Sequence, residues 1–309
     1  MPGLHHVSIM ASDAQRNADF YTGPLGLRFV KRTVNFDDPT NYHLYYGNLT
    51  GEPGTALTFF PWPGAIKGAR GAGETVATRF AIPQGSLNYW ADRLRQHQIS
   101  TSKFARFASV GLAFEDHDGT SLELIETPPD AHYDPWRDGA VPADHAIRGF
   151  EGVTLCVSRA NHTLDLLTKH MGYEIADRHE NRTRLHTPGS ARASIVEVVE
   201  DPAAPRPKFS AGSVHHIAFQ VDNDDAQAEI AARLTAAGLS PTPVQERVYF
   251  RSIYFRERGG VLFEIATNGP GFTVDEPVES LGTSLKLPPW YEKHRPDIEA
   301  GLSPLVIKQ

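Results

Sequence analysis

Hydrophobic and polar residues alternate in four short stretches of the chain. The stretches lie at residues 4–11, 76–83, 152–158 and 214–222. Successive side chains of a strand point to opposite faces, so the alternation predicts strands that each place one face against a core. The stretches recur at a loose spacing of about 65 to 75 residues, which indicates an internal structural repeat.

A helical pattern follows each of these strands. The predicted helices lie at residues 14–21, 86–96, 162–171 and 224–237. Three of them run into a glycine of the kind that ends helices, namely Gly23, Gly172 and Gly238. Three further short strands complete each repeat, and in the first repeat they cover residues 27–34, 42–46 and 55–60. The repeating unit is therefore a β-α-β-β-β module.

One such module cannot cover both faces of its own sheet, so modules are expected to pair, each pair curving into a cup. Four βαβββ modules give an α+β fold with two pseudo-symmetric, cup-shaped mixed β-sheet barrels and helices outside. A proline-rich stretch at 127–142 is the expected linker. It predicts an N-terminal domain at 1–130, holding modules one and two, and a C-terminal domain at 145–272, holding modules three and four. The irregular tail, 273–309, is expected to pack on the body.

The opening strand of the first module carries a histidine on its inner face. Val7 and Ile9 share one side of this strand with His5, and this apolar side is expected to meet the helix. His6 has the opposite parity. It is therefore expected to point into the cup.

The fourth module repeats this arrangement. Ile217 and His215 fall on the helix side of its opening strand, which leaves His216 facing the cup. In the last strand of the same module, the same count leaves Glu264 pointing inward among apolar neighbours. The sequence thus predicts two imidazoles and one carboxylate inside one cup.

A buried carboxylate is costly unless a cation or a hydrogen-bond network accompanies it. Two histidines and one carboxylate form the facial triad of non-haem Fe(II) oxygenases, which leaves neighbouring coordination positions open. We therefore predict that His6, His216 and Glu264 hold a metal ion. Thr58 stands in the first module where the fourth has its glutamate, so no fourth protein ligand is expected.

An alternative without a metal pairs the inward glutamate of the fourth module with an arginine, either Arg247 or Arg251. A second open question concerns the aromatic run at 42–46, which includes His43. This run fits either a core strand or the wall of a pocket for a flat ring.

The other two modules lack the histidines. Ala77 and Gly152 stand at the equivalent positions, although Glu123 and Glu197 retain inward acids on the last strands. We therefore expect the second cup to be non-catalytic. The pattern also predicts that the first module pairs with the fourth and the second with the third.

Composition narrows the class of protein. The 309 residues are 40% hydrophobic and 22% charged, which is ordinary for a globular enzyme. The net charge of −7 and the lack of long basic runs argue against nucleic acid as a partner. We see no secretion signal and no apolar run long enough to span a membrane, and the single cysteine, Cys156, cannot form an intramolecular disulfide. A cytoplasmic location is expected, and a homo-oligomer is compatible with the sequence.

Several segments together resemble a known family. They are Leu-His-His-Val at 4–7, Phe-Val-Lys-Arg-Thr at 29–33, Tyr-His-Leu-Tyr-Tyr at 42–46, His-Ala-Ile-Arg-Gly-Phe at 145–150, Val-His-His-Ile-Ala-Phe at 214–219 and Gly-Gly-Val-Leu-Phe-Glu at 259–264. In these segments, which extend over nearly the whole chain, the sequence resembles the hydroquinone-type ring-cleaving dioxygenases of the vicinal oxygen chelate (glyoxalase and bleomycin-resistance) superfamily.

The resemblance implies Fe(II), O2 and a small aromatic diol as substrate, often a chlorinated or methylated hydroquinone. It also implies roles around the iron for His5, Ser8, His215, Arg247 and Tyr254, which would steer O2, substrate charge and protons. Ideal strand parity turns both of these histidines away from the metal, so their roles require a twisted strand start or a hydrogen-bond relay. Ser8 stands where relatives often carry threonine, which keeps the hydroxyl.

Two rival functions fit the same scaffold. A glyoxalase-type lyase or isomerase would use Zn(II), Ni(II) or Co(II) and commonly four protein ligands, and Thr58 at the fourth position argues against it. A non-catalytic binder of a toxic aromatic compound would not need the inward histidines and glutamate. Analysis of the bound metal separates the three functions.

Overall fold

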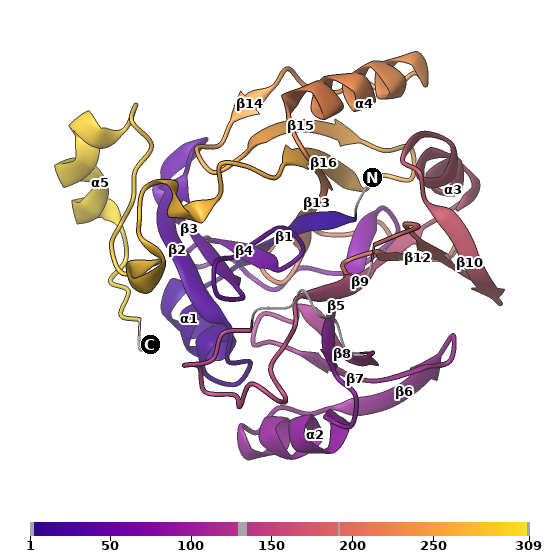
Figure 1. Cartoon of the computed structure of the whole chain (residues 1–309), viewed down its shortest axis with the longest axis horizontal. Helices are drawn as coiled ribbons and strands as arrows, with labels where there is room; N and C mark the ends of the chain where they lie inside the picture. The colour runs from indigo at the N-terminus through magenta and orange to yellow at the C-terminus, as the bar shows by residue number, and fades with distance from the viewer. Residues whose placement is uncertain (1–2, 129–134, 191, 308–309) are drawn as a thin grey trace.

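Two eight-stranded sheets form the body of the molecule (Figure 1). The computed structural model describes residues 3–128, 135–190 and 192–307, so part of the expected linker at 127–142 lies outside the described residues. The α+β class and the two curved sheets confirm the fold predicted from the sequence.

Sheet I combines the first and fourth modules. Its strand order is β14-β15-β16-β13-β1-β4-β3-β2. The strands are β1 (Leu4–Ala11), β2 (Arg28–Asn35), β3 (Asp38–Gly47), β4 (Ala56–Pro61), β13 (Val214–Val221), β14 (Gln245–Glu246), β15 (Arg251–Arg256) and β16 (Leu262–Thr267). The N-terminal strand therefore pairs with a strand more than 200 residues away, β1 running antiparallel to β13.

Sheet II combines the second and third modules in the order β10-β11-β12-β9-β5-β8-β7-β6. Its strands are β5 (Glu74–Pro83), β6 (Ser102–Arg106), β7 (Ser109–Glu115), β8 (Ser121–Thr127), β9 (Phe150–Val157), β10 (Glu174–His179), β11 (Arg182–His186) and β12 (Ile195–Glu200). The predicted pairing of modules is confirmed. Each sheet takes strands from both halves of the chain. The division into domains at 1–130 and 145–272 stays a prediction.

The module helices follow the opening strands, as the sequence predicted. They are α1 (Ala14–Thr22), α2 (Leu87–Gln96), α3 (Asn161–Asp165), which continues as a π-helix over Leu166–His170, and α4 (Asp224–Ala236). The C-terminal segment adds α5 (Arg295–Gly301) and 3₁₀ turns at Phe272–Val274, Val278–Ser280 and Glu292–His294. No helix among the described residues is long and apolar enough to cross a membrane.

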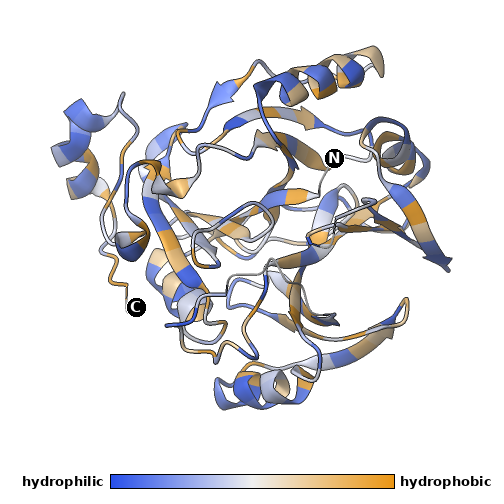
Figure 2. Cartoon of the chain, in the orientation of Figure 1, coloured by the Kyte–Doolittle hydropathy of each residue, from blue (hydrophilic) through white to orange (hydrophobic). Residues whose placement is uncertain are grey.

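Strand parity sorts the side chains as expected. Figure 2 shows hydrophobic and hydrophilic residues interspersed along the strands. On β1 and β13 the helix-facing residues Val7, Ile9, Ile217 and Phe219 are fully buried and belong to one continuous hydrophobic core. This core fixes which face of each strand turns inward, and so it fixes the direction of the polar residues between them.

The C-terminal segment closes one end of the cup formed by sheet I. The small inward residues Ala56, Ala218 and Ala266 pack in a cluster with Tyr249 and with Phe272 from that segment. Small side chains on three strands leave room for these aromatic rings. We call this the closed end of sheet I.

A buried ion pair holds the C-terminal segment in place. Lys31 on β2 is fully buried, and its Nζ atom lies 2.6 Å from Asp275 Oδ1 and also contacts Glu276. Farther along, Tyr42 donates its hydroxyl to the carbonyl of Ser303 at 2.9 Å. The tail therefore packs on the first module.

The interior of sheet II is filled by a buried arginine. Arg79 is fully buried on β5, its Nε atom is 2.8 Å from Glu151 Oε2, and its Nη1 atom contacts Glu197. The Nη2 atom of Arg184 also lies 2.9 Å from Glu197 Oε1. Burial alone would raise the pKa of Glu197, but the guanidinium groups of Arg79 and Arg184 outweigh it and lower this pKa to about 2. The acids that the sequence placed in this cup are thus paired with cations of the chain itself.

We expect Arg79→Ala to lower the free energy of unfolding by about 3–5 kcal/mol, because it removes the fully buried cation that contacts both Glu151 and Glu197. Urea denaturation measures this loss. Arg95→Ala is the matched control, since Arg95 is exposed and pairs with Asp92 at the surface, and no measurable change is expected. A wild-type unfolding free energy for Arg79→Ala would contradict a dominant role for this cation.

Candidate metal centre

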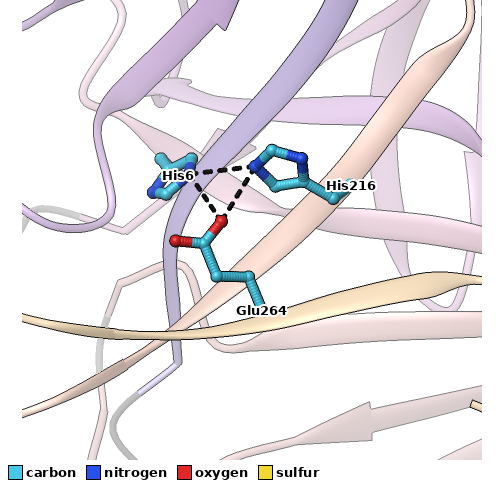
Figure 3. A group of neighbouring side chains, drawn as sticks. All are labelled: His6, His216 and Glu264. Atoms are coloured by element: carbon cyan, nitrogen blue, oxygen red, sulfur yellow. Dashed lines mark hydrogen bonds and ion pairs between the residues drawn. The ribbon is translucent and has the colours of Figure 1, made fainter. Parts of the chain in front are cut away.

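Strand register brings the three predicted ligands together. In the antiparallel pair of β1 and β13, His6 lies opposite Ala218 and Ser8 lies opposite His216. The parallel pair of β13 and β16 then aligns Ala218 with Glu264. The three ligand candidates therefore come from three neighbouring strands and point toward one another (Figure 3).

The donor atoms of these side chains converge. Glu264 Oε2 lies 2.9 Å from His216 Nε2 and 3.2 Å from His6 Nε2, and the two nitrogen atoms are 3.3 Å apart. Ligands at right angles around a metal, each about 2.1 Å from it, are separated by about 3.0 Å, whereas a tetrahedral arrangement gives about 3.4 Å. The observed spacing fits three neighbouring positions around one divalent ion.

Burial and charge favour the forms that bind metal. His6, His216 and Glu264 are all buried. Burial alone would raise the pKa of Glu264, but the adjacent imidazoles of His6 and His216 lower it well below its ordinary value. Burial also lowers the pKa of His216. An ionised carboxylate beside a neutral imidazole offers lone pairs to a cation. Among the described residues, no other group of histidine, cysteine and acidic side chains brings its ligand atoms together in this way.

The other carboxylate oxygen of Glu264 has its own partner. Ser252 on β15 is fully buried and donates its hydroxyl to Glu264 Oε1. This contact leaves Oε2 as the oxygen that faces the histidines. Ser252 was not among the residues predicted from the sequence, although its inward parity on a strand next to β16 was a usable signal.

Irregular strand pairing explains how the two flanking histidines approach the site. The register between β1 and β13 shifts between Leu4 and His6, which places His5 in a bulge. It shifts again between Ser8 and Ile9, where His215 is the extra residue on β13. Bulges turn side chains away from the regular alternation. The conflict between ideal parity and the implied roles of His5 and His215 is resolved in this way.

Each flanking histidine contacts its neighbouring ligand candidate. The Nδ1 atoms of His5 and His6 are 2.9 Å apart, and those of His215 and His216 are 2.7 Å apart. Burial and the adjacent His6 lower the pKa of His5 to about 3, while burial and His216 lower that of His215 to about 4. Both flanking rings are therefore neutral near pH 7.

Neutral flanking rings set the tautomers of the ligand candidates. If Nε2 of His6 binds a metal, its ring carries the proton on Nδ1 and donates it to Nδ1 of His5. His216 donates to His215 in the same manner. Each outer ring thus holds the orientation of the ligand ring beside it.

Ser8 belongs to a chain of hydrogen bonds behind the site. Its hydroxyl is 2.7 Å from that of Thr58, which is 2.9 Å from Nε2 of His43. The hydroxyl of Tyr45 in turn lies 2.9 Å from Nδ1 of His43. Ser8 is fully buried, so its contact is with Thr58 rather than with the pocket described below. The aromatic run at 42–46 therefore has both of the roles considered for it. Tyr45 belongs to a hydrophobic core cluster, and His43 lines the pocket.

Arg247 and Tyr254 lie together at the side of the site. Arg247 Nε donates to the hydroxyl of Tyr254 at 3.2 Å, and its Nη2 is 3.0 Å from Asp37 Oδ2. Burial alone would lower the pKa of Arg247, but Tyr254 and Asp37 outweigh it and raise the pKa. Arg251 pairs instead with Asp224 and Glu246. The alternative in which an arginine pairs with the inward glutamate is therefore wrong.

The site opens into a pocket of about 630 Å³. Its lining combines polar and aromatic residues. The lining residues are His6, Met10, Asn35, Phe36, Asp37, His43, Phe60, Trp62, Phe209, His215, His216, Gln245, Arg247, Phe250, Tyr254 and Leu262. The metal centre thus stands between this open end and the closed end of sheet I.

Comparison with known proteins gives concordant results. The model of the Glyoxalase/Bleomycin resistance protein/Dioxygenase superfamily matches residues 3–148 and again 149–265. A Bacillus subtilis (strain 168) protein named "Putative ring-cleaving dioxygenase MhqO" is 41% identical over 307 residues, covering 99% of this chain and 97% of that protein. The "Chlorohydroquinone/hydroquinone 1,2-dioxygenase" of Sphingobium indicum is 35% identical over 316 residues, covering 99% of this chain and 97% of that protein.

A solved structure is similar over the full length. The crystal structure of a "putative dioxygenase from Bacillus subtilis subsp. subtilis str. 168" matches with a TM-score of 0.96 at 40% sequence identity. The match covers 100% of this chain and 98% of that chain. The arrangement of the two sheets is thus shared with that protein.

We expect His6→Ala, His216→Ala and Glu264→Ala each to abolish stoichiometric binding of a divalent metal while the fold survives, because each removes one of three donor atoms. Elemental analysis after loading with metal, with circular dichroism as the test of folding, measures this. Glu123→Ala is the matched control in sheet II and should keep the metal. Loss of metal in the control, with retention in Glu264→Ala, would place the ion elsewhere.

Variants of the flanking histidines His5 and His215 are expected to weaken metal binding without abolishing it. His5→Ala and His215→Ala keep all three donor atoms but remove the groups that orient them, so metal affinity should fall by roughly 10- to 100-fold. Competition with a chelator measures the affinity. Unchanged affinity in both variants would show that the contacts between Nδ1 atoms do not orient the ligands.

Proposed function

Because the chain belongs to the glyoxalase/bleomycin resistance protein/dioxygenase superfamily and is a dioxygenase within it, we propose that it is an Fe(II)-dependent enzyme that opens the ring of a hydroquinone. The iron is held by His6, His216 and Glu264. The substrate is an aromatic diol, and the co-substrate is O2. The name of the Sphingobium indicum relative, which gives hydroquinone as its substrate, supports the choice of diol.

The observation that carries this proposal is the position of the three donor atoms at the inner end of a pocket lined by aromatic residues. Three protein ligands occupy one side of the ion and leave its other side toward the pocket. Fe(II) bound there would supply adjacent positions at which a substrate oxygen and O2 are brought together. A flat ring fits between the aromatic walls.

Arg247 and Tyr254 are suited to hold the ionised substrate. Both line the pocket, and Arg247 remains positively charged. Burial and the neighbouring Glu264 raise the pKa of Tyr254, so its hydroxyl keeps its proton at neutral pH. Because the Tyr254 oxygen accepts a hydrogen bond from Arg247 Nε, its own proton is free to be donated to a substrate oxygen. The pair thus offers a positive charge and a hydrogen bond to a phenolate.

The two remaining pocket histidines have different tasks. His215 lines the pocket and is neutral, so it accepts the hydrogen bond that orients His216 while its Nε2 side remains available to a bound molecule. His43 lies in the pocket wall, where its ring is 4.1 Å from that of Phe60 and its Nε2 is held by Thr58. These contacts keep His43 in one orientation at the side of the substrate.

A lyase of the glyoxalase type is less consistent with the site. Such an enzyme commonly places a fourth protein ligand on the metal, and the equivalent residue on β4 is Thr58. Its hydroxyl is already engaged by Ser8 and His43. The coordination position that a fourth ligand would fill is therefore left to substrate.

The direct test is oxygen consumption by protein loaded with Fe(II) under anaerobic conditions and then mixed with a hydroquinone and O2. We expect one O2 to be consumed for each hydroquinone, together with a ring-opened product identified by mass spectrometry. The metal-free protein serves as the blank for autoxidation. The absence of enzyme-dependent O2 uptake with every hydroquinone and catechol would reject the proposed activity.

The roles of Arg247 and Tyr254 predict unequal losses. A hydrogen bond to a charged group contributes about 1.5–3 kcal/mol, so Arg247→Ala should lower kcat/KM by roughly ten- to a hundred-fold. Tyr254→Phe removes one neutral hydroxyl and should cost less, and both variants should keep iron. Arg251→Ala is the matched control, because Arg251 pairs outside the pocket. Wild-type kinetics in both iron-loaded variants would remove Arg247 and Tyr254 from the site.

A further inference from the structure

The pocket is much larger than the ring of a hydroquinone. Its volume is about 630 Å³, whereas a cavity of about 150 Å³ is enough to bind benzene. Pockets of roughly 300–1,000 Å³ usually hold considerably larger ligands. A single ring that reaches the donor atoms would leave most of this space unfilled.

The unfilled space lies outward from the metal centre along the strands. Met10 and Phe60 each stand two residues beyond Ser8 and Thr58, which lie at the level of His216 in the sheet, and both line the pocket. A strand rises about 3.3 Å per residue, so this layer is roughly 6.6 Å farther out. Trp62 comes two residues after Phe60, roughly 13 Å out on the same count. The layers therefore extend past the far edge of a bound ring.

The residues that form these outer layers are apolar. In addition to Phe60 and Trp62, the aromatic residues Phe36 and Phe209 line the pocket. Phe209 is 46% exposed although it is a large aromatic residue. An exposed aromatic side chain at the mouth of a pocket contributes little to the core, and such surfaces commonly bind an apolar group.

The charges at the mouth are already paired. Asp37 and Arg247 are the charged residues besides histidine in the lining, and two hydrogen bonds of 3.0 and 3.2 Å join them. The other polar residues near them, Asn35 and Gln245, carry neutral amides. Arg247 already serves the phenolate, so an additional acidic group on the substrate would meet the Asp37 carboxylate and find no second arginine or lysine among the described lining residues.

From these features we infer that the natural substrate carries a bulky, uncharged, apolar substituent on its ring, such as a branched alkyl or an aryl group. Phe60, Trp62 and Phe209 bind this substituent while the diol reaches the metal centre. The inference rests on the proposed ring cleavage and adds the class of hydroquinone that the site selects.

The test compares kcat/KM of the Fe(II)-loaded enzyme, from O2 uptake, for hydroquinone, methylhydroquinone, tert-butylhydroquinone, phenylhydroquinone and the carboxylate-bearing gentisate. We expect the value to rise with the apolar substituent, by roughly tenfold or more between hydroquinone and the two bulky compounds. Gentisate should fall below hydroquinone. Anaerobic calorimetry should show the same order in Kd, which measures binding without turnover.

Variants of the outer layer locate the effect. Trp62→Ala and Phe209→Ala should each reduce the preference for phenylhydroquinone over hydroquinone by roughly tenfold. Ile66→Ala is the matched control, because Ile66 is a large apolar residue that is 79% exposed and does not line the pocket. Its preference should equal that of the wild type.

The outcomes separate the inference from the activity on which it rests. Turnover of hydroquinone with equal or lower kcat/KM and equal or weaker binding for the bulky compounds would overturn the inference and leave ring cleavage intact. An unchanged preference in both aromatic variants would also overturn it. Failure to turn over any of the compounds would reject the proposed function itself.

Discussion

A carboxylate buried inside a sheet must be matched by positive charge, and this constraint shapes both halves of the molecule. Glu264 in sheet I and Glu197 in sheet II occupy equivalent places, each on the last strand of a module and each fully buried. In sheet II the guanidinium of Arg79 supplies the charge from within the chain. In sheet I the neighbours of Glu264 are imidazoles, of which His216 favours its neutral form, so a bound cation is the natural counterpart.

The same comparison explains how the interiors of the two cups differ. Arg79 pairs across the sheet with Gly152, just as Ser8 pairs with His216. A long cationic side chain fills the interior of sheet II, and the small hydroxyl of Ser8 leaves the interior of sheet I free. The C-terminal segment packs on the inner alanines at one end, and the pocket lies at the metal centre.

Much of this arrangement follows from alternation along strands. Parity alone turns His6, His216 and Glu264 inward, because the helix-facing residues between them are unambiguously apolar. Parity fails at His5 and His215, since a bulge is a property of two paired strands and the pairing of β1 with β13 joins opposite ends of the chain. Each bulge then aims a second imidazole at a ligand candidate.

Other features depend on contacts that no local pattern encodes. Arg79 has inward parity in the sequence, but its ion pairs with Glu123, Glu151 and Glu197 depend on the register of sheet II. The burial of Lys31 required the C-terminal segment, whose irregular sequence has no period to interpret. The size of the pocket required the positions of loops, including the one that carries Phe209. Long-range packing, rather than local preference, decides these points.

The sharing of one metal ion by β1, β13 and β16 is tested most directly by anomalous diffraction at the iron absorption edge from crystals grown with Fe(II) under anaerobic conditions. One anomalous peak is expected, at bonding distance from His6 Nε2, His216 Nε2 and Glu264 Oε2, with none inside sheet II. A peak bound to other side chains, or no peak from crystals that contain iron-loaded protein, would contradict the assignment of this centre.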